Sequence, residues 1–339
     1  MMRLPYFAFH APRTVREAAD LVAATPGDSM LIAGGTDLLP NMKRRQQVPR
    51  SLISLRRVAE LRTIENGAGL SIGAGVTLTE LVRDTRVRAH GALWQAASQI
   101  ATPHLRNMGT LGGNLCLDTR CNYYDQNYEW RKAIDFCMKK DGATCWVALS
   151  SPKCLAVSST DTAPALMALG ADVTLVSSEG RRRLALTDLY RNDGIAYMTR
   201  RPTEILTAVH VPSPDGWRST YWKLRRRGAF DVPVLSVAAA VRVQSDGAIE
   251  AARIVLGAVA SRPIDAPAAA VALVGHTLTD ERIAAAAEAA ARGAKPMDNT
   301  DFTLVWRKRV TRDFVRYALR ELRGDDMRED RRRVARQLL

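Results

Sequence analysis

The apolar residues near the start of this chain recur at helical spacing, behind a residue pair that favours a helix start. Thr14 and Glu17 form a capping box, and apolar positions then recur along residues 15–22 at spacings of three and four. Thr77 and Glu80 form a second capping box, which predicts another short helix. Further helices are expected at residues 92–101, 162–169, 266–274, 279–292 and about 301–323.

Short apolar runs bounded by turn residues make up much of the remaining chain, and such runs are typical of β-strands. The expected strands lie at residues 30–33, 52–55, 70–75, 173–176, 183–186, 205–211, 219–225, 235–243 and 249–258. Asp246-Gly247 supplies a tight turn between the last two. Because helices dominate only after these strands, the order predicts an α+β fold with a domain boundary near residues 212–217.

Composition adds an expectation about solubility. Apolar residues make up 47% of the 339 positions and charged residues 25%, which is ordinary for a soluble globular protein. No run approaches the roughly 18 apolar residues of a membrane span. Residues 1–12 lack the basic start and apolar core of a signal peptide. We therefore expect a cytoplasmic protein without a membrane anchor.

The chain is strongly basic, with a formal net charge of +14. Much of the excess lies at residues 225–227 and 307–336, and the second stretch has the pattern of an amphipathic helix with a basic outer face. Such a charge suits nucleic acid or an acidic protein partner equally well. Because no zinc-finger or RNA-recognition motif accompanies it, we expect no nucleic-acid binding.

Two Gly-Gly pairs follow apolar segments and are candidate phosphate-binding turns. Gly34-Gly35 follows the strand expected at 30–33, and Gly112-Gly113 follows the helix expected at 92–101. Neither has the spacing of a Rossmann fingerprint or a P-loop. Paired glycines let consecutive backbone N–H groups point into one concavity, so two such nests could face each other across a pyrophosphate. Each pair taken alone is more typical of an ordinary tight turn than of a phosphate site.

The two turns together are more specific than either alone. Residues 33–37 (Ala-Gly-Gly-Thr-Asp) and 110–114 (Thr-Leu-Gly-Gly-Asn) resemble the two FAD pyrophosphate loops of molybdenum hydroxylase flavoprotein subunits. That family includes the medium subunits of carbon monoxide dehydrogenases and the FAD domains of xanthine dehydrogenases. The resemblance covers nearly the whole chain.

The resemblance implies a set of FAD contacts and a domain plan. The implied cofactor-binding residues are Met30, Leu31, Ile32, Ala33, Gly34, Gly35, Thr36, Asp37, Ala101, Thr102, Thr110, Leu111, Gly112, Gly113, Asn114, Asp161, Leu206 and Lys223. The implied plan is a PCMH-type FAD-binding domain at 1–213, made of α/β subdomains 1–58 and 59–213. A C-terminal α+β domain follows at 217–325, with an antiparallel sheet and helices as in carbon monoxide dehydrogenase flavoproteins, and then a polar tail at 326–339.

Three of these residues also have ordinary structural interpretations. Asp161 is well placed as the N-cap of the helix expected at 162–169. Lys223 could be a solvated residue of a strand, and Leu206 a core residue.

The segment from Cys116 to Cys154 follows neither helical nor strand periodicity and contains all five cysteines. Asn114 and Asp161 stand 47 positions apart, whereas the family pattern joins them within about nine, so roughly 38 residues are inserted. An insertion of that length without regular structure needs something to hold it. The four later cysteines have no zinc-ribbon or ferredoxin spacing, so a zinc site, unligated thiols or another metal centre all remain compatible with it. Disulfides are disfavoured by the odd count and the expected compartment.

The run from Gly112 to Cys121 is similar to that of the β subunits of 4-hydroxybenzoyl-CoA reductases, a branch of this family whose insertion carries a [4Fe–4S] cluster. This likeness implies cluster ligands at Cys121, Cys137, Cys145 and Cys154, with Cys116 as a spare buried thiol near the flavin loop. Aromatic residues at 123, 124, 128 and 130 would shield the cluster from water.

The same likeness implies an electron-transfer subunit that relays electrons between [4Fe–4S] and FAD. The implied partners are a molybdenum-cofactor subunit and a [2Fe–2S] subunit in an (αβγ)2 hetero-oligomer, with ferredoxin as donor and with 4-hydroxybenzoyl-CoA reduced to benzoyl-CoA on another subunit. The chain itself offers no general base or nucleophile, so no catalytic residue is expected. Two alternatives stay open. One is an FAD subunit of another molybdenum hydroxylase that oxidises its substrate. The other is a binding protein that contains a structural zinc site and no flavin.

Overall fold

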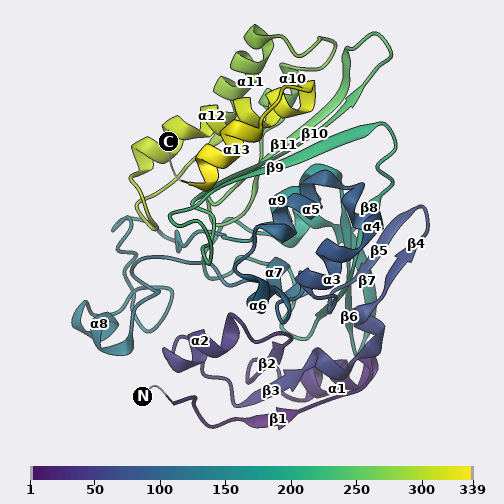
Figure 1. Cartoon of the computed structure of the whole chain (residues 1–339). Helices are drawn as coiled ribbons and strands as arrows, with labels where there is room; N and C mark the ends of the chain where they lie inside the picture. Colours follow the sequence, from purple (N-terminus) through teal and green to yellow (C-terminus); the bar gives the residue numbers. More distant parts are fainter. Residues whose placement is uncertain (1–2, 337–339) are drawn as a thin grey trace.

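The first part of the molecule is a small parallel sheet with two helices, at the bottom of the computed structural model in Figure 1. The structure describes residues 3–336; residues 1–2 and 337–339, which fall in the expected FAD-binding domain and polar tail, lie outside the described residues. The elements are β1 (Ala8–His10), α1 (Val15–Ala24), β2 (Ser29–Ile32), α2 (Leu38–Lys43) and β3 (Ser51–Ser54), with strand order β1-β3-β2. Thr14 caps α1 by accepting a hydrogen bond from the Glu17 amide at 3.1 Å, as expected.

The second part is a five-stranded antiparallel sheet covered by short helices. It contains β4 (Ile64–Asn66), β5 (Gly69–Gly73), α3 (Leu78–Arg83), α4 (Thr85–Arg88), α5 (Gly91–Ser98), α6 (Pro103–Arg106), α7 (Leu111–Leu115), α8 (Tyr128–Ala133), α9 (Thr162–Leu169), β6 (Asp172–Ser177), β7 (Gly180–Ala185) and β8 (Ile205–Pro212). Its strand order is β4-β5-β8-β6-β7. Helix α9 has the expected bounds because Gly170 ends it in a left-handed conformation, with φ of 74°.

The third part is an antiparallel sheet with helices on both faces. Its strands are β9 (Trp217–Leu224), β10 (Leu235–Val243), β11 (Ile249–Gly257) and β12 (Ile264–Asp265), and its helices are α10 (Pro267–Val271), α11 (Asp280–Gly293), α12 (Leu304–Arg323) and α13 (Arg328–Ala335). Alternate residues of β10 enter two different cores: Val237 and Ala239 pack with the C-terminal helices, whereas Ala238 and Ala240 pack with α5 and α9. Helices α5 and α9 are thus enclosed between the two larger sheets (Figure 1). The fold confirms the expected α+β class.

The basic C-terminal stretch contains the helix expected at about residues 301–323 as α12, which ends where Gly324 adopts a left-handed conformation (φ 113°). The stretch differs from its prediction in two respects. The described part of the polar tail contains a further helix, α13. Arg307 does not belong to a solvated face: it is fully buried and donates to the backbone carbonyls of Val234, Met297 and Ala258. Three accepting carbonyls satisfy the guanidinium in the interior.

Among residues 3–336, no helix combines the length and the apolarity that crossing a lipid bilayer requires.

Candidate functional site

The two glycine turns lie against each other where the first and second parts meet. Gly34 follows β2 and leaves no room for a side chain: a Cβ there would stand 2.0 Å from the carbonyl oxygen of Met108 and 2.9 Å from the amide nitrogen of Gly109. Gly35 has φ of +70°, which glycine adopts without strain. Close backbone approach and turn geometry therefore both require glycine in the first turn.

The amide groups of the two turns are used differently. Within the described residues, the N–H groups of Gly34 and Gly35 donate to no protein acceptor. In the second turn, Gly112 donates to the Ala74 carbonyl at 2.8 Å and Gly113 donates to Thr110 Oγ1 at 3.0 Å. The expectation of two facing amide nests is therefore wrong for the second turn, because a strand end and a helix cap already satisfy its donors.

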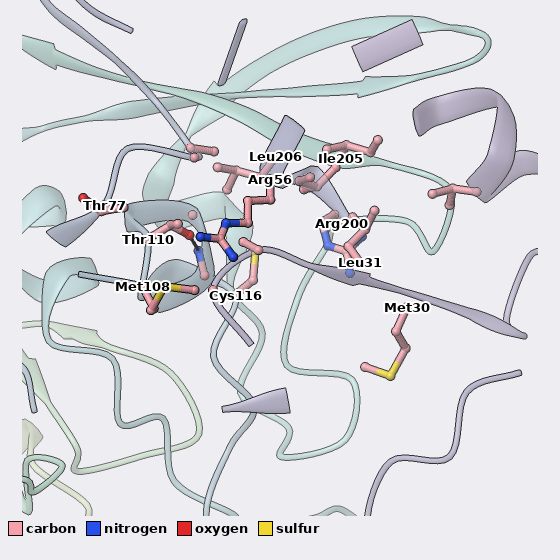
Figure 2. Close-up of a pocket in the computed structure, with 18 of the residues that line it drawn as sticks. Met30, Leu31, Arg56, Thr77, Met108, Thr110, Cys116, Arg200, Ile205 and Leu206 are labelled. Atoms are coloured by element: carbon pink, nitrogen blue, oxygen red, sulfur yellow. Dashed lines mark hydrogen bonds between the residues drawn. The ribbon is translucent and has the colours of Figure 1, made fainter. Parts of the chain in front are cut away.

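A cavity of about 440 Å³, which we call the dinucleotide pocket, opens between these turns and β8. Its volume lies in the range of small-molecule and cofactor sites. In Figure 2, Met108 and Thr110 lie on one side of this space, and Met30 and Leu31 lie on the other. The expected cofactor residues that line it are Met30, Leu31, Ala33, Gly34, Thr110, Gly112, Gly113 and Leu206.

Other expected contacts lie outside the wall of this cavity. They are Ile32, Gly35, Thr36, Asp37, Ala101, Thr102, Leu111, Asn114, Asp161 and Lys223. Asn114 anchors the start of α9, because its side-chain oxygen accepts hydrogen bonds from Thr160 and Thr162. Thr102 caps α6 by accepting from the Leu105 amide at 3.4 Å.

Asp161 and Lys223 form a buried ion pair at the junction of α9 and β9. Lys223 Nζ lies 2.9 Å from Asp161 Oδ1, and the Tyr221 hydroxyl donates to the same oxygen at 2.7 Å. Burial raises the pKa of Asp161 and lowers the pKa of Lys223, while each group's charge favours the ionised form of the other. Lys223 is buried, so the alternative of a solvated strand residue is wrong. Asp161 does stand at the N-cap position of α9, as expected, but its side chain makes no capping hydrogen bond.

The dinucleotide pocket also contains cations and a tyrosine that sequence reasoning did not identify. Arg56, Arg62, Tyr197 and Arg200 line it (Arg56 and Arg200 are labelled in Figure 2). Arg200 Nη1 donates to the Glu204 carbonyl at 2.5 Å, whereas its Nε is buried and has no partner among the described residues. These residues carry no motif, because they reach the pocket from separate loops. Their positive charge would suit a pyrophosphate.

Four cysteines line a second, much smaller cavity, which we call the thiol cavity. Its lining residues are Cys121, Tyr123, Cys137, Met138, Lys139, Cys145, Trp146, Cys154 and Ala156. The four thiols are free and buried, although they are spread over the whole insertion. Cys116 is separate and lines the dinucleotide pocket.

The thiol cavity supplies a suitable donor set for an iron–sulfur cluster, but not a finished metal site. Four cysteine thiolates are the usual ligands of a [4Fe–4S] cluster, in which each binds a different iron. The cavity measures about 10 Å³, room for about one water-sized group, so the thiols must move apart to admit a cluster. Among residues 3–336, no three or more His, Cys, Asp or Glu side chains are placed to hold a metal ion. Burial raises the pKa of Cys121 to about 12 and that of Cys154 to about 11, so ligation at neutral pH would release protons.

The expected aromatic shield is only partly in place. Tyr123 lines the thiol cavity and Tyr124 is buried beside it. Tyr128 and Trp130 lie on the outside, 42% and 39% exposed, because α8 projects from the body of the molecule (Figure 1). Trp146, which was not expected in this role, lines the cavity instead.

The insertion is fastened to the first glycine turn. Arg120, next to Cys121, forms an ion pair with Asp37, which directly follows that turn. Burial raises the pKa of Asp37, and the neighbouring Arg120 opposes this shift. Gln46, just after α2, donates to the Tyr124 carbonyl at 2.5 Å. These contacts therefore hold the cysteine-containing insertion against the segment that follows the first glycine turn.

Known proteins match the chain along nearly its whole length. The FAD binding domain in molybdopterin dehydrogenase matches residues 5–214, and the CO dehydrogenase flavoprotein C-terminal domain matches residues 219–322. The aldehyde oxidoreductase FAD-binding subunit PaoB of Escherichia coli is 33% identical over 76% of this chain and 82% of its own length. The nicotinate dehydrogenase FAD-subunit of Eubacterium barkeri is 30% identical over 82% of this chain and 83% of its own.

Solved structures give the same result. A carbon monoxide dehydrogenase chain from Hydrogenophaga pseudoflava, which lacks the Mo-pyranopterin moiety of its cofactor, superposes with a TM-score of 0.77 and 28% identity. The superposition covers 94% of this chain and 97% of that one.

Proposed function

Because this chain belongs to the family of FAD-binding subunits of molybdenum hydroxylases, we propose that it relays electrons between FAD and a [4Fe–4S] cluster. The family and the fold expected from the sequence are confirmed by the matches across both domains. The proposal adds two assignments: the dinucleotide pocket holds FAD, and Cys121, Cys137, Cys145 and Cys154 hold the cluster.

One observation carries the iron–sulfur assignment: the four cysteines implied as ligands line a single buried cavity. Nothing in their sequence spacing brings them together, and the insertion has only α8 as an α-helix. Lys139 is the one charged residue among the described residues that line the cavity, so no carboxylate competes as a ligand there. Four thiolates without hard oxygen donors favour iron–sulfur or zinc chemistry over magnesium or calcium.

The residues of the dinucleotide pocket bind and position; they supply no acid or base. The free amides of Gly34 and Gly35, with the cations of Arg56 and Arg200, suit the negative charge of a pyrophosphate. Leu206 and Met30 supply apolar wall. When bound, FAD would supply the conversion between one-electron and two-electron transfer. This chain contributes the position of the cofactor, its electrostatic surroundings and the exclusion of water.

We place the chain in a hetero-oligomer with a molybdenum-cofactor subunit and a [2Fe–2S] subunit. The names of its relatives support this placement, since they denote subunits or medium chains of larger enzymes. The reaction proposed for the assembly is the ferredoxin-dependent reductive dehydroxylation of 4-hydroxybenzoyl-CoA to benzoyl-CoA on another subunit. The net charge of +14 fits docking to an acidic electron carrier.

The test is anaerobic purification with iron, sulfide, zinc and FAD quantified per chain. We expect one FAD per chain, together with about four iron atoms and about four sulfides, as one [4Fe–4S] cluster contains. Cys137→Ala should lower iron and sulfide while FAD stays bound. Cys116→Ala is the matched control, because Cys116 lies outside the thiol cavity. Unchanged iron in Cys137→Ala would refute the ligand assignment, and a colourless zinc protein would refute the relay.

A second candidate keeps the flavin and reverses the electron flow. Relatives include an aldehyde oxidoreductase subunit and a nicotinate dehydrogenase subunit, names that denote substrate oxidation. In that case electrons would leave through FAD to an acceptor. Reconstitution with the partner subunits separates the two, because only the reductive enzyme consumes reduced ferredoxin with 4-hydroxybenzoyl-CoA.

A further inference from the structure

The connection between β7 and β8, residues 186–204, touches both cavities. Gly194 packs on the thiol cavity: its amide donates to the Cys154 carbonyl at 2.9 Å, and a Cβ at Gly194 would stand 2.6 Å from Cys154 Sγ. Three residues later, Tyr197 lines the dinucleotide pocket, and Arg200 lines it as well. The wall between the two cavities is therefore thin at this loop.

Lys139, a residue of the insertion, lies between the two cavities and contacts this loop. Its side chain is 6% exposed and lines the thiol cavity. Its ammonium group donates three hydrogen bonds, to Asp118 Oδ1 at 2.8 Å, Thr119 Oγ1 at 2.7 Å and the Gly194 carbonyl at 2.7 Å. All three donors of the ammonium are thus used, and none points to a sulfur. Any effect of Lys139 on the thiols is therefore electrostatic and does not require a hydrogen bond to sulfur.

The ammonium also faces the dinucleotide pocket across one aromatic ring. Lys139 Nζ lies 5.6 Å from the ring centroid of Tyr197, which lines that pocket, and 4.8 Å from the centroid of Tyr124. These distances are within the range of cation–π attraction. A buried positive charge therefore stands one side chain away from each proposed cofactor.

We propose that Lys139 sets the reduction potential of the group held by the four cysteines, by stabilising its reduced, more negative form. This inference rests on the proposed function. The net charge around an iron–sulfur cluster is one of the main determinants of its potential, and a buried charge is poorly screened. Asp118 accepts a hydrogen bond from Lys139 and carries the opposite charge, so it opposes the effect of Lys139 on the reduction potential. The two residues therefore have effects of opposite sign.

A purely structural role for Lys139 predicts something different. One of its three hydrogen bonds joins the insertion to the loop of Gly194, and the other two link residues within the insertion, so their loss alone would loosen the cavity. Loosening would change cluster retention but would not give shifts of opposite sign in Lys139 and Asp118 variants. The sign of the shift is the readout that separates the two roles.

The experiment uses the holoenzyme and an anaerobic redox titration, with the cluster followed by electron paramagnetic resonance and FAD by absorbance. For Lys139→Gln we expect the ratio of reduced to oxidised cluster at a fixed potential to fall at least tenfold, a shift of about −59 mV for one electron. For Asp118→Asn we expect a positive shift. Lys140→Gln removes the same charge from a more exposed neighbour, paired with Asp141 at 3.4 Å, and should leave the potential unchanged.

Equal shifts in Lys139→Gln and Lys140→Gln, or a negative shift in Asp118→Asn, would overturn the inference. If Lys139→Gln loses its cluster, Asp118→Asn, which keeps the lysine, decides the question by its sign. Iron and sulfide analysis of the unaltered protein is made first. A chain with no cluster brings down this inference together with the proposed function, whereas a loaded chain with unmoved potentials brings down this inference alone.

Discussion

Replacing Gly34 by alanine tests whether the contact between the two turns is needed for FAD binding. The added Cβ would stand 2.0 Å from the Met108 carbonyl oxygen, 2.5 Å from its carbon and 2.9 Å from the Gly109 nitrogen. All three atoms belong to the backbone, so no side chain can rotate away. The two turns must separate by about 1 Å to restore ordinary contact, a backbone shift of the kind that overpacking forces.

The magnitude follows from that displacement. Overpacking that forces a backbone shift costs about 1–3 kcal/mol of the free energy of unfolding. A phosphate held by the free amides of Gly34 and Gly35 would lose a hydrogen bond when this turn moves by about 1 Å. Each hydrogen bond to a charged group is worth about 1.5–3 kcal/mol, which is at least a tenfold loss of FAD affinity.

The assay measures FAD affinity of the apoprotein by fluorescence titration and stability by urea unfolding without FAD. Gly67→Ala is the matched control: Gly67 lies in an exposed turn, and its added Cβ would meet no atom within 4 Å. We expect Gly34→Ala to lose both stability and affinity and Gly67→Ala to lose neither. If Gly34→Ala bound FAD as tightly as the unaltered protein, the turns would not form the cofactor cradle.

Three further predictions concern buried charge. Lys223→Met should lower the free energy of unfolding by about 3–5 kcal/mol, because it leaves the Asp161 carboxylate buried without its partner; urea unfolding should show partial recovery in the double variant with Asp161→Asn. Burial lowers the pKa of His90 below its usual 6.5, so its neutral form contributes stability that is complete above about pH 6.5 and is lost as the pH falls through the lowered pKa. Urea midpoints at pH 7.5 and 5.5 should therefore differ less in His90→Gln than in the unaltered protein, and equal differences would contradict this assignment. Arg307→Met should destabilise the third part by several kcal/mol, since three backbone carbonyls lose their buried donor, and a change below about 1 kcal/mol would show that they find other partners.

Local pattern was sufficient for most helices and strands of the chain. Both predicted helix starts are confirmed, since Thr14 and Thr77 accept from the amides three residues later. The reciprocal half of the capping box forms only at Thr77, because the Glu17 carboxylate accepts from the Arg13 amide instead of the Thr14 amide. Helix α9 begins and ends where the sequence indicates, because a largely apolar run is stopped by a glycine in the left-handed conformation. These features depend on residues within one or two turns of each other, so the sequence contains the required information.

Positions that depend on distant partners were predicted less well. Arg307 lies in the stretch whose basic residues were expected on an outer face, but it is fully buried, whereas the apolar Val305 of the same helix is 71% exposed. Helical periodicity places residues on a face, but it cannot say where a neighbouring helix or strand ends. The Arg307 guanidinium donates to three backbone carbonyls: Val234 just before β10, Ala258 just after β11, and Met297 between α11 and α12.

For the candidate site, the sequence by itself determined the two glycine turns, the five clustered cysteines and, through family resemblance, a flavin-binding fold. Only the tertiary structure decided that Asp161 pairs with Lys223, that Arg200 and Tyr197 line the dinucleotide pocket, and that Lys139 lies beside the four thiols. The pairing of Asp161 with Lys223 joins residues 62 positions apart, and the thiol cavity brings Lys139 against Cys121 and Cys154 from the two ends of the insertion. Their formation depends on how sheets and loops stack, and no local spacing along the chain records that arrangement.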